Sequence, residues 1–289
     1  MTSDAPQDSW QPSKRAQERT AWRRARARRS ALVAGVSTLA VIAILVALVL
    51  ATPGWPLVRD SFFDWRYGLQ VLPDIARGLM VNVAIMLGCG AVIVVLGLLI
   101  AWCRTLPGAV FFPLRALAAA YTDLFRGLPL ILLLLLLGFG VPGLRLAWLP
   151  SSGLFWGCVA LVLTYSAYVA EVFRAGIESV HPSQRAAARS LGLSHSLTMR
   201  CVVVPQAARR VMPPLLNDLV SLQKDSGLIS VLGVTYDAVL QARIASAESF
   251  NLTPYVVAGL LFVLLTIPMT RLTDWLARRQ GWTAAGGAL

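Results

Sequence analysis

Residues 183–205, SQRAAARSLGLSHSLTMRCVVVP, form a polar and basic interruption in a chain that is otherwise largely apolar. The alanines at 186–188 favour a helix because alanine loses no side-chain entropy there. Gly192 is suited to end that helix or to form a turn. The β-branched run before Pro205 ends where a new helix can begin, since proline fits a first helical turn. The stretch predicts a short helix, a turn and a second short helix on one face of a membrane.

The composition of the whole chain indicates a membrane protein. Hydrophobic residues make up 57% of the sequence, charged residues only 14%, and the mean hydropathy is +0.67, whereas soluble domains carry about 25% charge. A net charge of +12 would suit nucleic acid only on a folded polar surface, which this composition does not supply. The arginine excess instead follows the positive-inside rule of membrane proteins. The four cysteines lack paired spacing, which predicts free thiols and no metal site.

The N-terminal region divides into three segments. Residues 1–30 are polar and arginine-rich, which is typical of a solvated, disordered tail and predicts a cytoplasmic location. Residues 31–52 carry no charge and are long enough to cross a hydrocarbon core, which takes about 20 helical residues. A signal peptide is the alternative, but the preceding polar region is too long and no clear cleavage site follows, so we favour a retained transmembrane helix. Residues 53–74 mix aromatic residues with balanced charge and predict an outer interfacial segment.

Residues 75–279 contain the remaining apolar spans. These are expected at residues 75–102, 116–139, 154–174, 206–222 and 254–275. Together with the N-terminal helix they predict an all-α membrane protein of about six transmembrane helices, followed by a tail at 280–289. Because most arginines fall on one side of the spans, both termini are expected in the cytoplasm. The span at 206–222 is expected to be interrupted, since it holds two adjacent prolines and is followed by charges.

Motifs for catalysis or nucleotide binding are absent or misplaced. Residues 138–143, GFGVPG, match the glycine pattern of dinucleotide sites, but they follow a leucine run and contain a helix-breaking proline, so they predict a helix end and a turn. The only lysines, Lys14 and Lys224, do not follow a glycine, which excludes a Walker A phosphate loop. No HExxH pattern or nucleophile elbow occurs. The sequence predicts no enzyme and no cofactor, so ATP would have to be bound by a separate polypeptide.

Ionisable side chains within spans are costly unless they are paired or hydrated, which makes each of them a functional candidate. Two pairs lie three residues apart, Asp123 with Arg126 and Glu171 with Arg174. Each pair therefore shares a helical face and can form an ion pair. Both lie near span ends, where they either brace helices at the interface or form part of a gate.

A second group of polar residues is expected to line a substrate pathway. Proline and glycine loosen the backbone around the span at 206–222, so polar groups there are expected to face a watery cavity. An amide, a cation and an anion complement the carboxylate and ammonium of a zwitterionic amino acid. The alternative is that Lys224 and Asp225 pair only with each other, or with Glu171 and Arg174, and brace the gate. The expected pathway residues are Asn82, Tyr165, Tyr168, Asn217, Lys224 and Asp225.

The spacing within residues 183–205 resembles the cytoplasmic loop of bacterial ABC importer permeases, in which Glu-Ala-Ala precedes a glycine and then an aliphatic-x-aliphatic-Pro pattern. The surroundings that resemble the polar amino acid permease branch are RGLP (126–129), AYVAEVFRAGIESV (167–180), PQAARR (205–210) and LQKDSGL (222–228). Two residues depart from the family pattern, because Ala186 stands in place of the usual Glu and Gly227 in place of a frequent Ser. The resemblance covers residue 78 to about residue 279.

This resemblance implies a permease subunit of an ATP-driven ABC importer in the bacterial inner membrane, forming the pathway for amino acid uptake. It implies three kinds of partner: a cytoplasmic ATPase dimer that binds ATP, a second permease subunit in a homo- or heterodimer, and an extracytoplasmic solute-binding protein. The loop would dock in a groove of the ATPase, and without a carboxylate at Ala186 that docking is expected to depend on Gly192 and apolar contacts. The coupling residues that the resemblance implies are Gln184, Ala186, Ala187, Ala188, Leu191, Gly192 and Pro205.

Two other classes of protein are compatible with a helical bundle that contains charges. A secondary transporter or channel for small polar solutes has no need of a docking loop, and co-purification with an ATPase distinguishes it from an ABC permease. A membrane-embedded enzyme needs a catalytic constellation, which the sequence does not show.

Overall fold

The computed structural model describes residues 13–106, 108–233 and 236–279, and within these ranges the chain forms helices and turns without a β-strand. The all-α class expected from the sequence is therefore confirmed. The chain falls into two units, one ending at Arg59 and the other beginning at Asp60. The predicted C-terminal tail at 280–289 and the first part of the basic tail lie outside the described residues.

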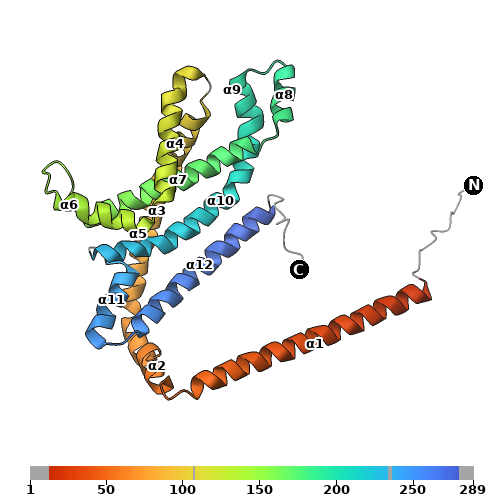
Figure 1. Cartoon of the computed structure of the whole chain (residues 1–289), viewed down its shortest axis with the longest axis vertical. Helices are drawn as coiled ribbons and strands as arrows, with labels where there is room; N and C mark the ends of the chain where they lie inside the picture. Colours follow the sequence, from red (N-terminus) through yellow and green to blue (C-terminus); the bar gives the residue numbers. More distant parts are fainter. Residues whose placement is uncertain (1–12, 107, 234–235, 280–289) are drawn as a thin grey trace, which may run out of the picture. The chain divides into compact units, whose positions relative to one another are not determined.

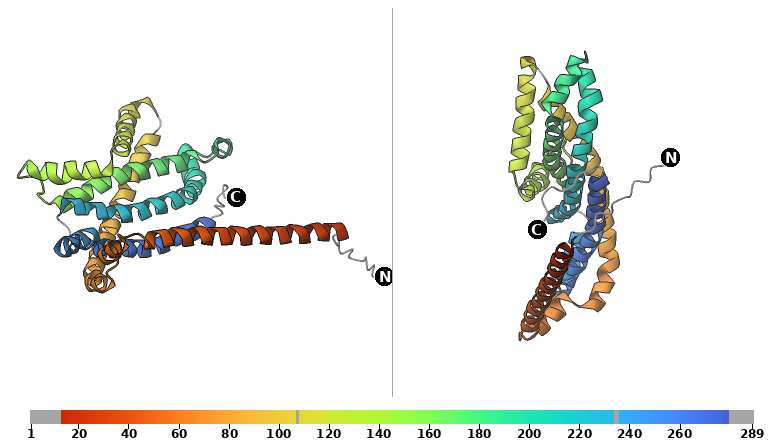
Figure 2. Two further views of the ribbon diagram at one scale, coloured as in Figure 1. Left: turned by 60° about the horizontal axis from the view of Figure 1, so that its bottom comes forward. Right: turned by 90° about the vertical axis from the view of Figure 1, so that its right-hand side faces the viewer.

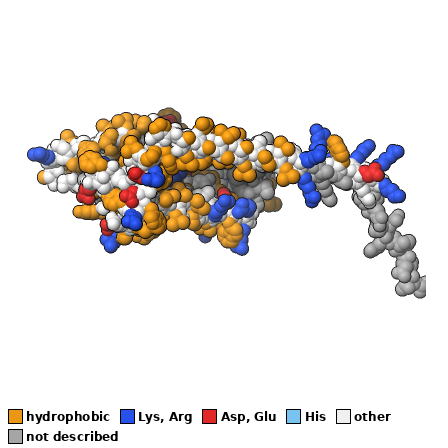
Figure 3. All heavy atoms as spheres, turned by 90° about the horizontal axis from the view of Figure 1, so that it is seen from below, with side chains coloured by type: hydrophobic (Ala, Val, Ile, Leu, Met, Phe, Trp, Pro, Cys, Tyr) orange, Lys and Arg blue, Asp and Glu red, His pale blue; other side chains and the backbone are white. Residues whose placement is uncertain are grey.

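The first unit contains α1 (Lys14–Leu50), one continuous helix of 37 residues. The prediction of disorder is wrong for residues 14–30, which form the first turns of this helix. Arginine, lysine, glutamine and alanine are strong helix formers, and no glycine or proline lies between residues 14 and 34 to stop the helix. Basic side chains surround the N-terminal part of α1 and hydrophobic ones cover the remainder (Figure 3). A short helix, α2 (Trp55–Phe62), follows.

The boundary between the two units falls within α2, and the first helix that lies wholly in the second unit is α3 (Trp65–Thr105), which has 41 residues. Its start lies well before residue 75, so the last part of the predicted interfacial segment belongs to a long helix. The carboxylate of Asp64 accepts a hydrogen bond of 3.1 Å from the backbone N–H of Tyr67 and caps the first turn. Pro73 lies in the first half of α3, and the helix continues through it.

The span expected at 116–139 is broken. Helix α4 (Phe112–Gly127) and helix α5 (Leu130–Leu135) meet at an angle of 101° across Leu128 and Pro129. Leu128 is extended, with φ −88° and ψ 132°, because a residue before proline is driven out of the helical region. A π-helical turn (Leu136–Gly140) and the short α6 (Val141–Gly143) complete the segment. The glycine-rich stretch at 138–143 therefore lies at a helix end.

The polar stretch at 183–205 forms a helical hairpin between two long helices. Helix α7 (Gly153–Glu178) leads into α8 (Pro182–Ser190), and α9 (His195–Thr198) runs through a π-helical turn (Met199–Val203) into α10 (Val204–Asp225). The hairpin and the α3–α4 turn lie at the same end of the second unit (Figures 1 and 2). The predicted helix, turn and second helix are present, and the second helix joins α10 directly.

The last part of the chain differs from expectation. Helix α10 continues through Pro213 and Pro214, so the break lies later, where a 3₁₀ helix (Ser226–Leu232) takes over and ends at Gly233 with φ 68°. Helix α11 (Ala238–Ser249) was not predicted; the carboxylate of Asp237 caps it by accepting bonds from the N–H groups of Val239 and Leu240. The final helix is α12 (Thr253–Arg279).

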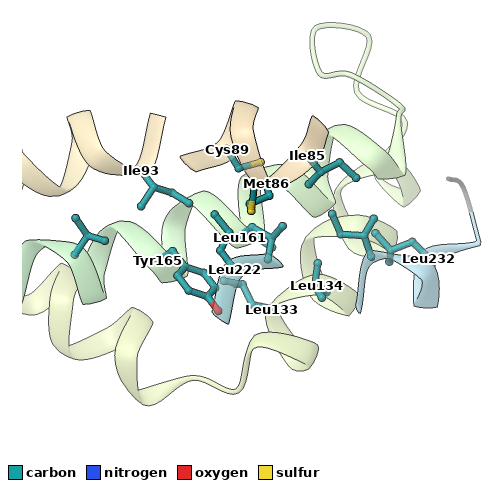
Figure 4. Close-up of a cluster of buried hydrophobic side chains, with 13 residues drawn as sticks. Ile85, Met86, Cys89, Ile93, Leu133, Leu134, Leu161, Tyr165, Leu222 and Leu232 are labelled. Atoms are coloured by element: carbon teal, nitrogen blue, oxygen red, sulfur yellow. The ribbon is translucent and has the colours of Figure 1, made fainter. Parts of the chain in front are cut away.

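The core of the second unit lies between α3, α5, α7 and the end of α10. Its buried side chains include Ile85, Met86, Leu134, Leu161 and Leu222 (Figure 4). Two glycines allow the helices to approach closely: a Cβ on Gly97 of α3 would lie 2.5 Å from a Val169 methyl group, and one on Gly176 of α7 would lie 2.1 Å from a Val211 methyl group. Small residues at such contacts are typical of membrane helix packing.

Among the described residues, four helices are long and apolar enough to cross a membrane, or five if the bent α4–α6 pair counts as one span. The four lie within Arg26–Leu50, Trp55–Thr105, Gly153–Glu178 and Thr253–Arg279. The span predicted at 206–222 corresponds to α10, which is not among them, so the total of six spans stays a prediction.

Candidate functional site

A polar cavity of about 490 Å³ lies where the α4–α5 break faces α7 and α10. Proline at 129 opens the break, and side chains one helical turn apart on α7 and α10 project toward it. The polar side chains that line the cavity are Arg126, Thr164, Tyr165, Tyr168, Asp218, Ser221 and Asp225. Three helical segments therefore contribute to one polar site.

The cation and one anion of the cavity are held by the two tyrosines of α7. The hydroxyl of Tyr165 donates a hydrogen bond of 2.7 Å to a carboxylate oxygen of Asp225. The guanidinium of Arg126 lies over the ring of Tyr168, 5.6 Å from its centroid, a distance at which a cation is attracted to the ring face. The hydroxyl of Tyr168 donates to the Arg126 carbonyl at 3.4 Å.

Two polar atoms of residues that line this cavity have no hydrogen-bond partner among the residues that the structure describes. They are Oδ2 of Asp218 and Oγ1 of Thr164, and both are buried. Buried polar atoms are nearly always hydrogen-bonded in proteins, and an unpaired one costs about 1–3 kcal/mol. The cavity is thus lined by Asp218 and Thr164, each with one buried unpaired oxygen, and by the cation of Arg126, an arrangement suited to a small molecule with an ammonium and a carboxylate.

A separate ion-pair network joins α3, α4 and the last turns of α7. Arg104 of α3 donates to Oε2 of Glu171 at 2.8 Å and to the hydroxyl of Thr122 at 3.0 Å. Glu171 also pairs with Arg174, which in turn pairs with Glu178. The side chains of Arg104 and Glu171 are 18% and 23% exposed, so this network is largely shielded from water.

The gate or bracing pairs behave differently from each other. The ion pair between Glu171 and Arg174 is formed, as expected from their spacing. In the part of the chain that the structure describes, Asp123 and Arg126 form no ion pair; both are exposed, and Arg126 instead stacks on Tyr168. A shared helical face was therefore not sufficient for pairing, because a ring on the neighbouring helix lies within reach of the arginine.

Some of the expected pathway residues line the cavity, and others do not. Tyr165, Tyr168 and Asp225 line the cavity. Asn217 and Lys224 are exposed outside it. Asn82 is fully buried away from the cavity: its amide donates to Ser226 at 3.2 Å and accepts from the N–H of Ala238 at 3.0 Å. Both ends of its amide are thus occupied within the chain, and its place in the substrate pathway stays a prediction.

The hairpin presents part of the expected coupling surface. Gly192 has φ 83°, and the bonds from its N–H to Arg189 and from the N–H of Leu193 to Ala188 complete a Schellman helix end. Six of the expected coupling residues are exposed. These are Gln184, Ala186, Ala187, Leu191 and Gly192 on the hairpin and Pro205 at the start of α10. Ala188 is only 5% exposed, so it packs inward in this structure, and its docking contact stays a prediction.

Sequence reasoning missed Asp218 and Thr164 in the cavity and Arg104 in the network. Asp218 lies next to Asn217 in the polar part of α10, but the sequence does not show which of two neighbours faces the cavity. Arg104 lies far along the chain from Glu171, and no spacing rule relates residues of separate helices.

The fold and these sites define a class of protein: a helical membrane protein with a polar cavity between its helices and a polar hairpin at one end. The family model described as "Binding-protein-dependent transport system inner membrane component" matches residues 93–282, and the chain belongs to this family. Such a protein is a component of a transport system in the inner membrane, and this chain is a multi-pass membrane protein of that kind.

Similar proteins include the arginine transport system permease protein ArtQ of Bacillus subtilis, at 32% identity over 72% of this chain and 92% of the relative. The glutamate/aspartate import permease protein GltK of Escherichia coli is 29% identical over 75% of this chain and 98% of the relative. The crystal structure of an amino acid ABC transporter with histidines matches with a TM-score of 0.67 and 32% identity, covering 73% of this chain and 96% of that chain. The inward-facing MetNI methionine ABC transporter shares the fold, with a TM-score of 0.58 at 19% identity over 71% of this chain and 95% of that chain.

Proposed function

We propose that this chain is a permease subunit of an ATP-driven importer and forms the transmembrane pathway for an amino acid. The relatives whose names state a substrate transport or import amino acids, and this supports the same class of substrate here. The observation that carries the proposal is the polar cavity between the α4–α5 break, α7 and α10. Its volume of about 490 Å³ lies within the usual range for small-molecule sites, about 300–1,000 Å³.

The charges of the cavity give the substrate its orientation. The ammonium of an amino acid approaches the carboxylate of Asp218 beside Thr164, and its carboxylate approaches the guanidinium of Arg126, since all three side chains line the cavity. Burying either charged group without a partner is expensive, so a solute that lacks one of them is rejected. Asp225 is already engaged by Tyr165 and shapes the site beside them.

The energy for uptake comes from a separate ATPase, because this chain has no Walker A loop. Membership of the family implies an ATPase and a second permease subunit as partners, and the name of the family implies a solute-binding protein. The hairpin of α8 and α9 meets the ATPase on the cytoplasmic side through its exposed residues Ala187 and Leu191. Both termini are cytoplasmic, and the chain itself carries no cofactor and catalyses no reaction.

Reconstitution tests this function directly. The chain is purified with its ATPase, its second permease and its binding protein, placed in proteoliposomes, and supplied with a panel of radiolabelled amino acids. We expect accumulation of at least one amino acid that requires ATP and is lost when the Walker A lysine of the ATPase is replaced by alanine. Uptake driven by an ion gradient without ATP, or failure of the chain to co-purify with an ATPase, would support a secondary transporter or channel instead.

A further inference from the structure

The C-terminus of α7 receives two arginine side chains from the hairpin region. The guanidinium of Arg185, on α8, donates to the carbonyl of Ile177. The guanidinium of Arg210, on α10, donates to the carbonyl of Ser179, the residue that caps α7. The C-terminus of α7 thus binds one arginine side chain from each of two other helices.

Helix chemistry explains why arginines bind there. The last carbonyls of a helix have no partner within the helix, and the aligned peptide dipoles place a partial negative charge at that end. A guanidinium satisfies the carbonyl and the dipole together, and a hydrogen bond to a charged group is stronger than one between neutral groups. The two arginines therefore add charged bonds to the end of α7, beside the weak backbone bond of 3.4 Å that the Ile177 carbonyl accepts from the N–H of Val180.

Further contacts close a triangle between α7, α8 and α10. The side chain of Gln206 on α10 donates to the side chain of Gln184 on α8. Beneath these polar contacts, Val180 packs in a buried cluster with Val203 and Ala207. The exposed hairpin is therefore not a loose loop, because it is bound to α7 and α10 at their ends.

The same two helices carry the cavity. Tyr165 and Tyr168 lie on α7, and Asp218 and Asp225 lie on α10. Tyr168 precedes Ile177 on one uninterrupted helix, so their separation is about 13 Å. A displacement of the end of α7 thus moves the tyrosine that holds Arg126.

We propose that Arg185 and Arg210 are positioning residues that couple the hairpin to the cavity by binding the C-terminus of α7. This inference rests on the proposed function, since it presumes that the hairpin meets an ATPase. A displacement of α8 passes through Arg185 to α7, and Arg210 makes α10 follow, so that both walls of the cavity move together. Without these bonds α8 can move while α7 stays in place.

The test is the number of amino acid molecules transported per ATP hydrolysed by the full complex in proteoliposomes. In Arg210→Gln we expect this ratio to fall about tenfold, the factor in an equilibrium that corresponds to one hydrogen bond to a charged group. Arg210→Lys keeps a cation that can reach the carbonyl and is expected to restore a large part of the ratio. The matched control is Arg209→Gln, which removes the same charge from an exposed neighbour and should leave the ratio unchanged.

A purely structural role predicts a different result. Loss of folding lowers transport and ATP hydrolysis in proportion, so an unchanged ratio in Arg210→Gln, whatever the yield, overturns the inference. Arg185→Gln is the second variant; it retains the cap from Arg210 and is expected to lower the ratio even where Arg210→Gln does not assemble. An unchanged ratio in Arg185→Gln contradicts the inference as well.

Gly192→Val, measured in parallel, separates this inference from the proposed function. Valine is strained at φ 83°, so the variant disrupts the hairpin while both arginines remain. If Gly192→Val transports normally, the hairpin does not couple the chain to an ATPase and the proposed mechanism fails. If Gly192→Val loses transport while both arginine variants keep the ratio, only the role of the two arginines is wrong.

Discussion

Two regions along α7 use polar side chains in opposite ways. In the last turns of α7, the carboxylate of Glu171 has partners from two arginines, and Arg174 reaches Glu178 as well. In the middle of α7, the hydroxyl of Thr164 is buried and, within the described ranges, has no hydrogen-bond partner, and the same is true of one carboxylate oxygen of Asp218 on α10. The charged groups of the first region are paired with one another, whereas the two polar atoms of the second region are unpaired in the part of the chain that the structure describes.

The difference indicates what each region does. A fully satisfied network rigidifies the helices that contribute to it, whereas an unsatisfied buried group carries an energetic cost that a ligand can remove. The network of Arg104 and Glu171 therefore fixes α7 against α3 and α4, whereas the cavity lined by Asp218 and Thr164 is the place where we propose that a solute binds. The following predictions test that division, from the largest expected effect to the smallest.

Glu171→Gln should destabilise the protein most. It leaves Arg104 and Arg174 without their shared carboxylate in a region where both are mostly shielded, and breaking a buried pair in this way costs about 3 kcal/mol. The measurement is the thermal unfolding midpoint of the purified complex in detergent. The control is Asp74→Asn, which breaks an ion pair whose side chains are 79% and 62% exposed and should cost under about 1 kcal/mol. Equal shifts in the two variants would mean that the network does not stabilise α7.

Asn82→Ala should lower stability and leave substrate preference intact. The substitution leaves the buried N–H of Ala238 without its acceptor, and an unmade hydrogen bond of this kind costs about 2 kcal/mol. The Ser226 hydroxyl loses the bond from Asn82 but keeps its own bond to the Gln223 carbonyl. Ser226→Ala leaves the bond from Ala238 to Asn82 in place and should cost less. Unfolding midpoints and the ranking of transported amino acids are measured together. A changed ranking in Asn82→Ala would return this residue to the substrate pathway.

Asp218→Asn should change transport while stability is kept. Removing the charge that faces the ammonium is expected to weaken substrate affinity about tenfold and to relax the rejection of solutes without an amino group. The apparent affinity is read from substrate concentration curves for uptake. The control is Asn217→Ala, one position away and exposed, for which we expect no change in ranking. The cavity assignment fails if Asp218→Asn behaves like its control.

Local sequence patterns predicted those parts of the fold that depend on neighbours in the chain. The hairpin is the best case, since alanine propensity, the positive φ of Gly192 and the proline at 205 each act within a few residues. Helix propensity also favours the arginine-rich start of α1, yet charge composition suggested disorder there, and propensity prevailed. The pair Glu171 and Arg174 was found because it lies on one helix.

Contacts between separate helices could not be predicted from the sequence. The sequence predicts Asn82 in a substrate pathway, and only the fold reveals that Ser226 and α11 occupy both ends of its amide. Charge spacing predicted a pair for Asp123 and Arg126, and the competing ring of Tyr168 belongs to another helix. Prolines had different effects at two places in the chain. Pro129 lies at a bend between two helices, whereas α10 continues through Pro213 and Pro214. The surrounding helices determine whether the carbonyls that lose their bonds at a proline are tolerated.

The close approach of α7 and α10 at Gly176 restricts how this sequence can diverge. Any side chain at Gly176 would overlap one methyl group of Val211, which lies close to where its Cβ would be placed. An alanine at residue 176 is therefore compatible with the fold only when a smaller residue stands at 211, so the two positions have to change as a pair. The same holds for Gly97 and Val169 between α3 and α7. At these two helix contacts, substitutions are expected only in compensating pairs, while residues on the outward faces of the same helices can be substituted singly.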